Sequence, residues 1–347
     1  MKDKEGCNMP HINSFGCTAA GEKVQEIVLQ NSQREARILT FGATLRVLRV
    51  PDRSGAVRDV VLGYSDITGY ETNGGYLGAV VGRYANRIAG ACIESKGLSY
   101  ALTANEGSNQ LHGGPKALSH RVWTLKRATE TEAVLQIVSP DGDNGFPGNL
   151  TVTVTYTLTE QGLRLHYEAV TDRRTPCCLT NHTYFNLNGE GTILQHQLQL
   201  EAEEYLPVDE QKIPLGVMNP VAGSPFDFTV PKTVGQDINA PDPQLQRCGG
   251  YDHNYVLRGD GFRRIAGVRG DKSGIELEVW TTLPGVQLYT GNRLHTSANT
   301  KAGQPYGAHG GLCLETQFFP DSPHHPAWGG WLEPGQKYDE TTEYRFL

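Results

Sequence analysis

Hydrophobic and polar residues alternate with a period of two along much of the chain, which is the pattern of β-strands with one buried face. The clearest run lies between Leu150 and Val170. From Leu150 to Leu158 every second residue is aliphatic or aromatic and those between are threonines; after a polar segment at 160–162, alternation resumes from Leu163 to Ala169. This run predicts an antiparallel hairpin with one buried face and one threonine-rich face.

Shorter alternating runs occur at residues 25–29, 35–50, 123–138, 193–200, 275–281 and 286–290. They are separated by Gly, Asn, Asp and Pro, and no amphipathic helix of more than about three turns is evident. The pattern predicts an all-β fold. Because no linker or repeat divides the sequence, we expect a single domain over residues 1–347, in which residues 1–20 are a candidate for a loose N-terminal extension.

The charge and the cysteine content limit the partners and the compartment. The net charge is −7, whereas a nucleic acid or an anionic membrane would call for a basic surface, so we expect neither partner. The sequence has no run of about 18 apolar residues and no signal peptide, which predicts a cytoplasmic protein. The 7 cysteines are scattered and odd in number, which indicates reduced thiols.

The segment 180–187 contains the first candidate for chemistry. In an extended strand His182, Tyr184 and Asn186 would share one face, because side chains alternate. An imidazole, a phenol and an amide make a poor core but suit a cleft for a ligand rich in hydroxyl groups. The alternative is that His182 is an ordinary structural histidine, because the ability of an imidazole to titrate near neutral pH does not make it catalytic.

Five further stretches place polar groups among strand hydrophobics, at residues 82–88, 109–114, 250–255, 285–292 and 312–318. In the last of these, alternation predicts that Leu312 and Leu314 face the core while Glu315 faces the other way. Placing a carboxylate in such a strand carries a desolvation cost unless it faces a polar cleft. The alternative is an outward, solvated strand face.

Together these stretches resemble the aldose 1-epimerase family, the galactose mutarotases. The resemblance covers nearly the whole chain, and its motifs follow the family's order. They are FGATL at 41–45, GRYANRI at 82–88, NQLHGG at 109–114, DGDNGFPGNL at 141–150, TNHTYFNL at 180–187, EYLPVD at 204–209, YDHNYVL at 251–257 and LETQFFPDSPHHPAW at 314–328.

The resemblance implies a large antiparallel β-sandwich, the galactose mutarotase-like supersandwich, whose concave face binds a free aldose. It implies interconversion of the α and β anomers of hexoses such as D-galactose and D-glucose, with no cofactor and no metal. By position in the motifs, His182 matches the general acid, Glu315 the general base and His112 a second active-site histidine. The positions expected to contact the sugar are Asn86, Arg87, Asp252 and Gln287, with Tyr184 beside the catalytic histidine.

These residue types suit the reaction because opening a hemiacetal moves two protons. A base takes the proton of the C1 hydroxyl while an acid supplies one to the ring oxygen. An imidazole with an unperturbed pKa near 6.5 suits the acid. The base must be ionised, so we expect Glu315 to be partly hydrated or hydrogen-bonded.

Three alternatives stay open at the level of sequence. A hexose-phosphate mutarotase should have extra basic residues in the pocket, but Arg83 and Arg87 belong to the neutral-sugar pattern. A glycosidase could pair Asp252 with Glu315, which leaves His182 without a task. A non-catalytic sugar-binding sandwich would need no acid–base pair. The preferred aldose, the oligomeric state, the separate roles of His112 and His182, and any role of Cys177 and Cys178 are not determined by the sequence.

Overall fold

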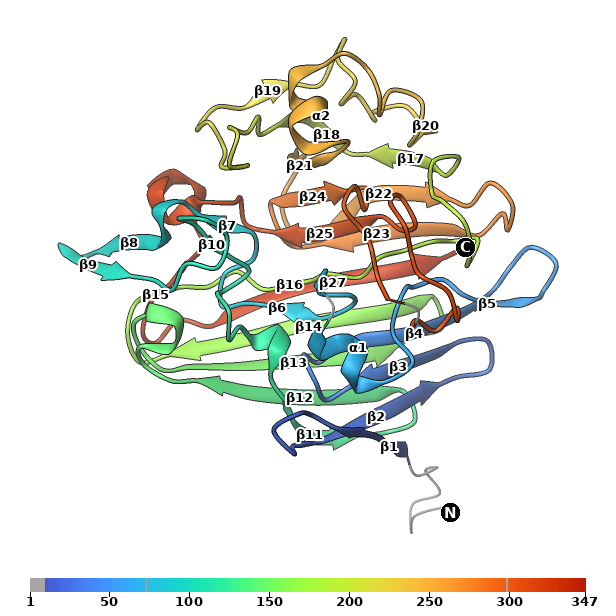
Figure 1. The fold of residues 1–347 in the computed structure, drawn as a ribbon, viewed down its shortest axis with the longest axis horizontal. Coiled ribbons are helices and arrows are strands. Elements are labelled where there is room, and N and C mark those ends of the chain that lie inside the picture. Colours follow the sequence, from blue (N-terminus) through green and yellow to red (C-terminus); the bar gives the residue numbers. More distant parts are fainter. Residues whose placement is uncertain (1–9, 73, 298) are drawn as a thin grey trace.

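The computed structural model describes residues 10–72, 74–297 and 299–347, and nearly all of its regular structure is antiparallel β-sheet (Figure 1). The predicted all-β class is confirmed. The largest sheet has nine strands, in the order β11 (Thr124–Ala128), β12 (Glu132–Ser139), β13 (Leu150–Leu158), β14 (Gly162–Thr171), β27 (Tyr338–Phe346), β23 (Glu276–Thr281), β22 (Arg263–Arg269), β17 (Gln197–Leu200) and β20 (Lys232–Thr233).

Two five-stranded sheets accompany it. One has the order β1 (His11–Cys17), β2 (Lys23–Gln30), β3 (Glu35–Leu39), β4 (Leu45–Pro51) and β5 (Val57–Asp59). The other has the order β19 (Asn219–Pro220), β18 (Ala202–Tyr205), β21 (Asp252–Leu257), β24 (Gly285–Tyr289) and β25 (Cys313–Gln317). Thus part of the segment 1–20 belongs to a sheet, and residues 1–9 lie outside the described residues.

Short elements connect the sheets. The two-stranded pairs are β6 (Val80–Val81) with β16 (Thr180–Asn181), β7 (Arg87–Ile88) with β10 (Gln110–Leu111), β8 (Cys92–Ser95) with β9 (Leu98–Ala101), and β15 (Thr175–Pro176) with β26 (Trp331–Leu332). The α-helices are α1 (Ile67–Thr72) and α2 (Pro243–Cys248), and the 3-10 turns are Ala89–Ala91, Leu118–His120, Asp143–Gly145, Ser322–His324 and Pro326–Trp328. No helix in the described part of the chain is long and apolar enough to cross a membrane.

The predicted hairpin is formed by β13 and β14, which pair over their whole length from Leu150 with Thr171 to Leu158 with Leu163. Along β13 the apolar residues are buried and the threonines are half-buried, as the alternation predicted. The other edge of β14 pairs with β27, which pairs in turn with β23. Figure 1 shows this red C-terminal strand between the green and the orange parts of the sheet.

One hydrophobic core joins the sheets. It includes Ile27 and Ile38 from the N-terminal sheet, Val154 and Leu165 from the nine-stranded sheet, and Val286 from the sheet that carries β25. Sheets packed through their apolar faces in this way form a sandwich. The single-domain organisation stays a prediction.

In the segment 180–187, β16 covers only the first two residues. Beyond β16 the backbone changes partners: the N–H of His182 donates to the carbonyl of Ala79, and the N–H of Phe185 donates to the carbonyl of Leu312. Because its backbone bonds go to different segments, this stretch is no regular strand, and strict alternation does not hold over its whole length.

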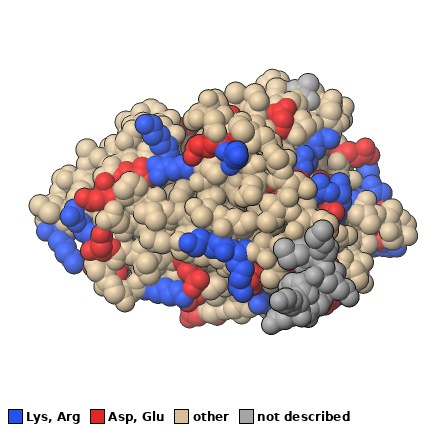
Figure 2. Space-filling model, turned by 90° about the horizontal axis from the view of Figure 1, so that it is seen from below, with Lys and Arg blue, Asp and Glu red and all other residues tan. Residues whose placement is uncertain are grey.

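On the face shown in Figure 2, basic and acidic side chains lie in small mixed groups. The described residues of this face therefore present no continuous basic surface of the kind that a nucleic acid requires. The net charge of −7 agrees with this distribution.

Replacement of Leu165 by alanine should destabilise the protein by about 2–5 kcal/mol, because a fully buried side chain is lost from the core. Val170→Ala is the matched control on the same strand, since Val170 is 51% exposed and should change the free energy of unfolding by less than about 0.5 kcal/mol. Urea unfolding of both variants measures this difference. Equal losses would contradict the assignment of the two faces of β14.

Candidate active site

A pocket of about 180 Å³ brings together most of the residues expected from the sequence. It is lined by Gly75, Tyr76, Asn86, Arg87, Glu106, Leu111, His112, His182, Tyr184, Lys212, Asp252, Tyr289, Arg293 and Glu315. A larger hollow of about 620 Å³ lies between residues 52–58 and 269–274 and contains none of the predicted site residues. The smaller pocket is therefore the candidate active site.

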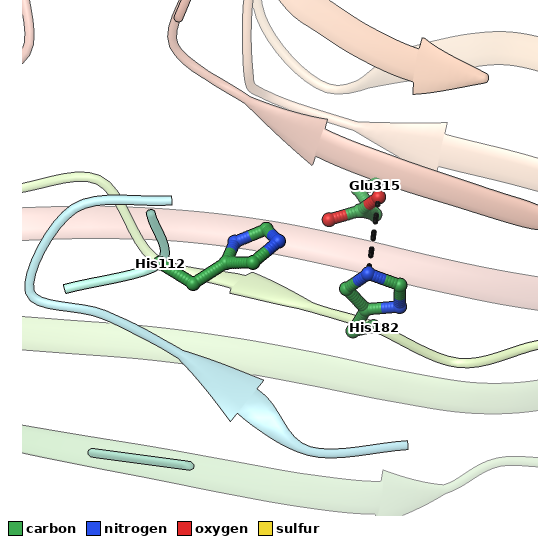
Figure 3. A group of neighbouring side chains, drawn as sticks. All are labelled: His112, His182 and Glu315. Carbon is green, nitrogen blue, oxygen red and sulfur yellow. Dashed lines mark ion pairs between the residues drawn. The ribbon is translucent and has the colours of Figure 1, made fainter. Parts of the chain in front are cut away.

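His182 and Glu315 face each other in this pocket (Figure 3), with His182 Nε2 and Glu315 Oε1 3.7 Å apart. His182 directly follows β16, and Glu315 lies at the middle of β25. The two side chains come from segments more than a hundred residues apart, and both are at least nine-tenths buried. An acid and a base so placed can act on two neighbouring atoms of one small ligand.

Aromatic rings fix the orientation of His182. Its ring stacks on Tyr184 at a centroid distance of 5.0 Å and on Tyr76 at 5.8 Å. Its Nδ1 lies 3.5 Å from the Sγ of Cys313, so Nε2 is the nitrogen that faces Glu315. Burial lowers the pKa of His182 to about 4, because the charged ring has lost its water.

The pKa of Glu315 is shifted in the opposite direction to that of His182. Burial, reinforced by the negative charge of Asp252, raises the pKa of Glu315 to about 8, and Arg87 opposes this only in part. Its Oε2 has no hydrogen-bond partner among the described residues. In the sugar-free protein, burial thus favours a protonated Glu315 and a neutral His182, whereas an ionised carboxylate was expected from the sequence.

His112 is held in one tautomer. Its backbone has a φ of 53°, and its Nδ1 accepts a hydrogen bond of 3.1 Å from the backbone N–H of Asn86. An imidazole that accepts at Nδ1 has its proton on Nε2. Burial and the neighbouring His182 and Arg87 keep the pKa of His112 well below its usual range, so this ring is a neutral donor.

Ligand atoms of His112, His182 and Glu315 all lie within 4.8 Å of one another, which is the spacing of a metal site. The tautomer of His112 does not fit a metal. A metal-binding histidine normally donates its second N–H to an acceptor, but Nδ1 of His112 faces the N–H of Asn86. Nε2 of His112 therefore has no free lone pair for an ion.

Two ion pairs occupy the walls of the pocket. Arg87 binds Glu106 through both Nε and Nη2, the latter at 2.8 Å. Lys212 Nζ lies 2.7 Å from Asp252 Oδ2. Burial alone would raise the pKa of Asp252, but the positive charges of Lys212 and Arg87 outweigh it and lower the pKa to about 2. The environment thus favours the ionised form of Asp252, in contrast to Glu315.

Seven of the eight predicted site residues line the pocket; the other is Gln287. It lies behind Asp252, to which its Nε2 donates a hydrogen bond of 2.9 Å, so its contact with a sugar stays a prediction. The expectation that Asn186 shares the face of His182 is wrong. Its Nδ2 instead donates to the backbone carbonyls of residues 190, 191 and 310.

Sequence reasoning missed five pocket residues as site candidates: Tyr76, Glu106, Lys212, Tyr289 and Arg293. Alternation along β24 could have identified Tyr289. Tyr76 and Lys212 lie in loops with φ values of 55° and 63°, and no periodic pattern predicts where such turns direct a side chain.

We expect the ring of His112 to be neutral at about pH 6.5 and above, with its proton on Nε2, because its pKa lies well below the unperturbed value near 6.5. Long-range ¹⁵N–¹H spectra of ring-labelled histidine measure this tautomer, and loss of the signal in His112→Gln assigns it. A proton on Nδ1, or a titration midpoint near 6.5, would contradict the assignment.

Comparison with known proteins gives a consistent result. The sequence profile of the family described as Aldose 1-epimerase matches residues 25–345. A galactose mutarotase from Bos taurus is 43% identical, over 93% of this chain and 94% of its own. An aldose 1-epimerase from Escherichia coli K12 is 39% identical, over 94% of this chain and 96% of its own.

Solved structures agree with the sequence relatives. An aldose epimerase homologue from C. elegans has a TM-score of 0.86 and 33% identity, covering 93% of this chain and 98% of that chain. A galactose 1-epimerase from Lactobacillus acidophilus has a TM-score of 0.85 and 29% identity, covering 97% of this chain and 98% of that chain. The predicted sandwich of the galactose mutarotase type is thereby confirmed.

Proposed function

Since this chain belongs to the aldose 1-epimerase family and is therefore an isomerase, we propose that it interconverts the α and β anomers of free hexoses such as D-galactose and D-glucose. The observation that carries the proposal is the buried pair of His182 and Glu315, 3.7 Å apart in a pocket of sugar-binding chemistry. We propose a free aldose as the only partner of this site, and the cytoplasm as its compartment; the six described cysteines are free thiols, which supports the latter.

Ring opening would begin with transfer of the O1 proton to Glu315. As the C1–O5 bond breaks, His182 would give its proton to O5, which avoids a poor alkoxide leaving group. Rotation about C1–C2 then turns the aldehyde. For ring closure the neutral imidazole takes the proton back from O5, while the carboxylic acid protonates the aldehyde oxygen, so both groups return to their initial state.

The reactive form of the pair has the proton on His182 and a negative charge on Glu315. This form has the same number of protons as the resting form, in which the proton lies on Glu315. A sugar hydroxyl that donates to Glu315 would favour the reactive form, because hydrogen bonds to a carboxylate stabilise its charge. Sugar binding would thus prepare the pair for catalysis.

His112 would donate a hydrogen bond from Nε2 to a sugar oxygen and would not serve as the acid. Its tautomer and its depressed pKa support this separation of roles. Arg87 and Asp252 would hold sugar hydroxyls by charge-assisted hydrogen bonds, with Asn86 and Tyr184 completing the contact surface.

The rival functions have less support. The guanidinium of Arg83, a candidate to clamp a phosphate, is buried and donates to the carbonyls of Ser139, Pro140 and Pro147. Arg87 is bound to Glu106. A binding module without catalysis would not need His182 opposite Glu315.

The direct test is polarimetry of freshly dissolved α-D-galactose and α-D-glucose. The protein should accelerate the approach to the buffer's final rotation without a change in sugar mass. His182→Ala and Glu315→Ala should each lower turnover by at least about 10²-fold, because each removes one proton-transfer group.

His166→Ala and Glu168→Ala are the matched controls, since both residues lie on the solvent-facing side of β14. They should retain wild-type turnover. A folded His182→Ala protein with near-normal turnover would exclude that residue as the acid, and a folded wild-type protein inactive on both sugars would refute the proposed substrates.

The pH dependence of kcat/KM should show a plateau between about pH 4 and pH 8. Below this range His182 and Glu315 are both protonated, so no base is present; above it the pair has lost its proton, so no acid is present. The rate should fall about tenfold per pH unit outside the plateau. Rates corrected for buffer catalysis, with circular dichroism at each pH, measure this; a narrow maximum near pH 6.5 would contradict it.

A further inference from the structure

Three buried amides lie behind the acid–base pair, on adjacent strands of the sheet that carries Glu315. Asn254 on β21, Gln287 on β24 and Gln317 on β25 are 2%, 4% and 0% exposed. In the strand register Asn254 pairs with Gln287, and Gln287 pairs with Glu315. Gln317 lies two residues beyond Glu315, so both side chains leave the same face of β25.

Most polar atoms of this group are unbonded. Among the described residues, no hydrogen bond reaches either polar atom of Asn254, either polar atom of Gln317, Oε1 of Gln287 or Oε2 of Glu315. The Nε2 of Gln287 does have a partner, Asp252. Buried polar groups in native proteins are nearly always bonded to protein or to ordered water, so this cluster points to a ligand that can both donate and accept.

Gly285 is closely packed against the cluster. It pairs with Gln317 in the register, and a Cβ added to Gly285 would lie 2.7 Å from Oδ1 of Asn254 and 3.0 Å from Cδ1 of Phe319. The amide of Asn254 therefore leans over this glycine. Glycine at this position thus lets the amide of Asn254 lie close to the backbone of β24, opposite Gln317 in the register.

We propose that ordered water molecules bridge the unbonded amide atoms of Asn254 and Gln317 to Oε2 of Glu315 and solvate the general base from behind. A buried water molecule typically makes about three hydrogen bonds to groups without another partner. Asn254 and Gln317 are then positioning residues, which act on Glu315 through water. This inference rests on the proposed function in taking Glu315 as the base.

The internal water favours the reactive form of the pair, because it donates hydrogen bonds to the carboxylate. The charged and titratable groups that interact with Glu315 include Asp252, Arg87, His112, His182, Tyr184, Cys178, Cys313 and Tyr344. None of them bonds its Oε2. Without the water, the proton would be held more firmly on Glu315, and fewer molecules would have it on His182.

The test is Gln317→Leu, which removes the amide and nearly preserves its volume. The carboxyl pKa of Glu315, measured by ¹³C NMR, should rise by about one unit, a tenfold loss of the ionised fraction at a given pH. The plateau value of kcat/KM should fall about tenfold, and the alkaline limb of the profile should shift about one pH unit higher. General damage to the fold would lower the rate without moving that limb.

Crystal structures of the sugar-free proteins supply the second measurement. Water within hydrogen-bond distance of Glu315 Oε2 and of Asn254 or Gln317 should be present in the wild type and lost in the variant. If Gln317→Leu does not fold, Asn254→Leu should raise the pKa of Glu315 in the same way. The control is Gln136→Leu, on the half-buried face of β12 outside the active site, which should leave the pKa of Glu315 unchanged. A dry site in which the two amides bond each other, or an unchanged pKa in both variants, would overturn the proposal.

The carboxyl titration and the water positions do not depend on turnover. If the wild type fails to accelerate mutarotation while both structural results are as expected, the proposed function fails and the water-filled site stands. If mutarotation is normal and the site is dry, the proposed function stands and the proposal of ordered water fails.

Discussion

Burial of a carboxyl group against an imidazole is the constraint on which the rest of this pocket depends. A charge taken from water into a protein interior is costly unless it is paired or hydrogen-bonded. Here the cost is avoided by neutrality: the pKa of His182 falls to about 4 and that of Glu315 rises to about 8. His182 and Glu315 share one proton. A small ligand that forms a hydrogen bond with either side chain can therefore change which of the two is protonated.

The surrounding charges support this arrangement. Asp252 and Lys212 form an ion pair at 2.7 Å, and Arg87 is bound by Glu106. Asp252 can bind hydroxyl groups without changing its own protonation near neutral pH, because its pKa lies near 2. Binding and proton transfer are thus assigned to different carboxylates, although both lie in one pocket of about 180 Å³.

The fold and the site could be predicted from the sequence wherever the alternation of apolar and polar residues extends over a long segment. The β13–β14 hairpin follows directly from its alternation, and the face of Glu315 follows from that of β25. The segment 180–187 shows the limit: its backbone changes partners after β16, so the alternation that places His182 and Tyr184 correctly fails at Asn186. Lys212 depends on a loop with positive φ, and protonation depends on burial that only the assembled structure provides.

The position of β27 has a consequence for biosynthesis. This strand, made after all the others of its sheet, lies between β14 and β23 and is the connection between the two parts of the nine-stranded sheet. While residues 338–346 are still inside the ribosomal exit tunnel, β11–β14 and β23–β20 each have an unpaired edge. Such edges attract other strands, so we expect the nascent chain to need protection by chaperones until residues 338–346 have left the tunnel and β27 has paired with β14 and β23.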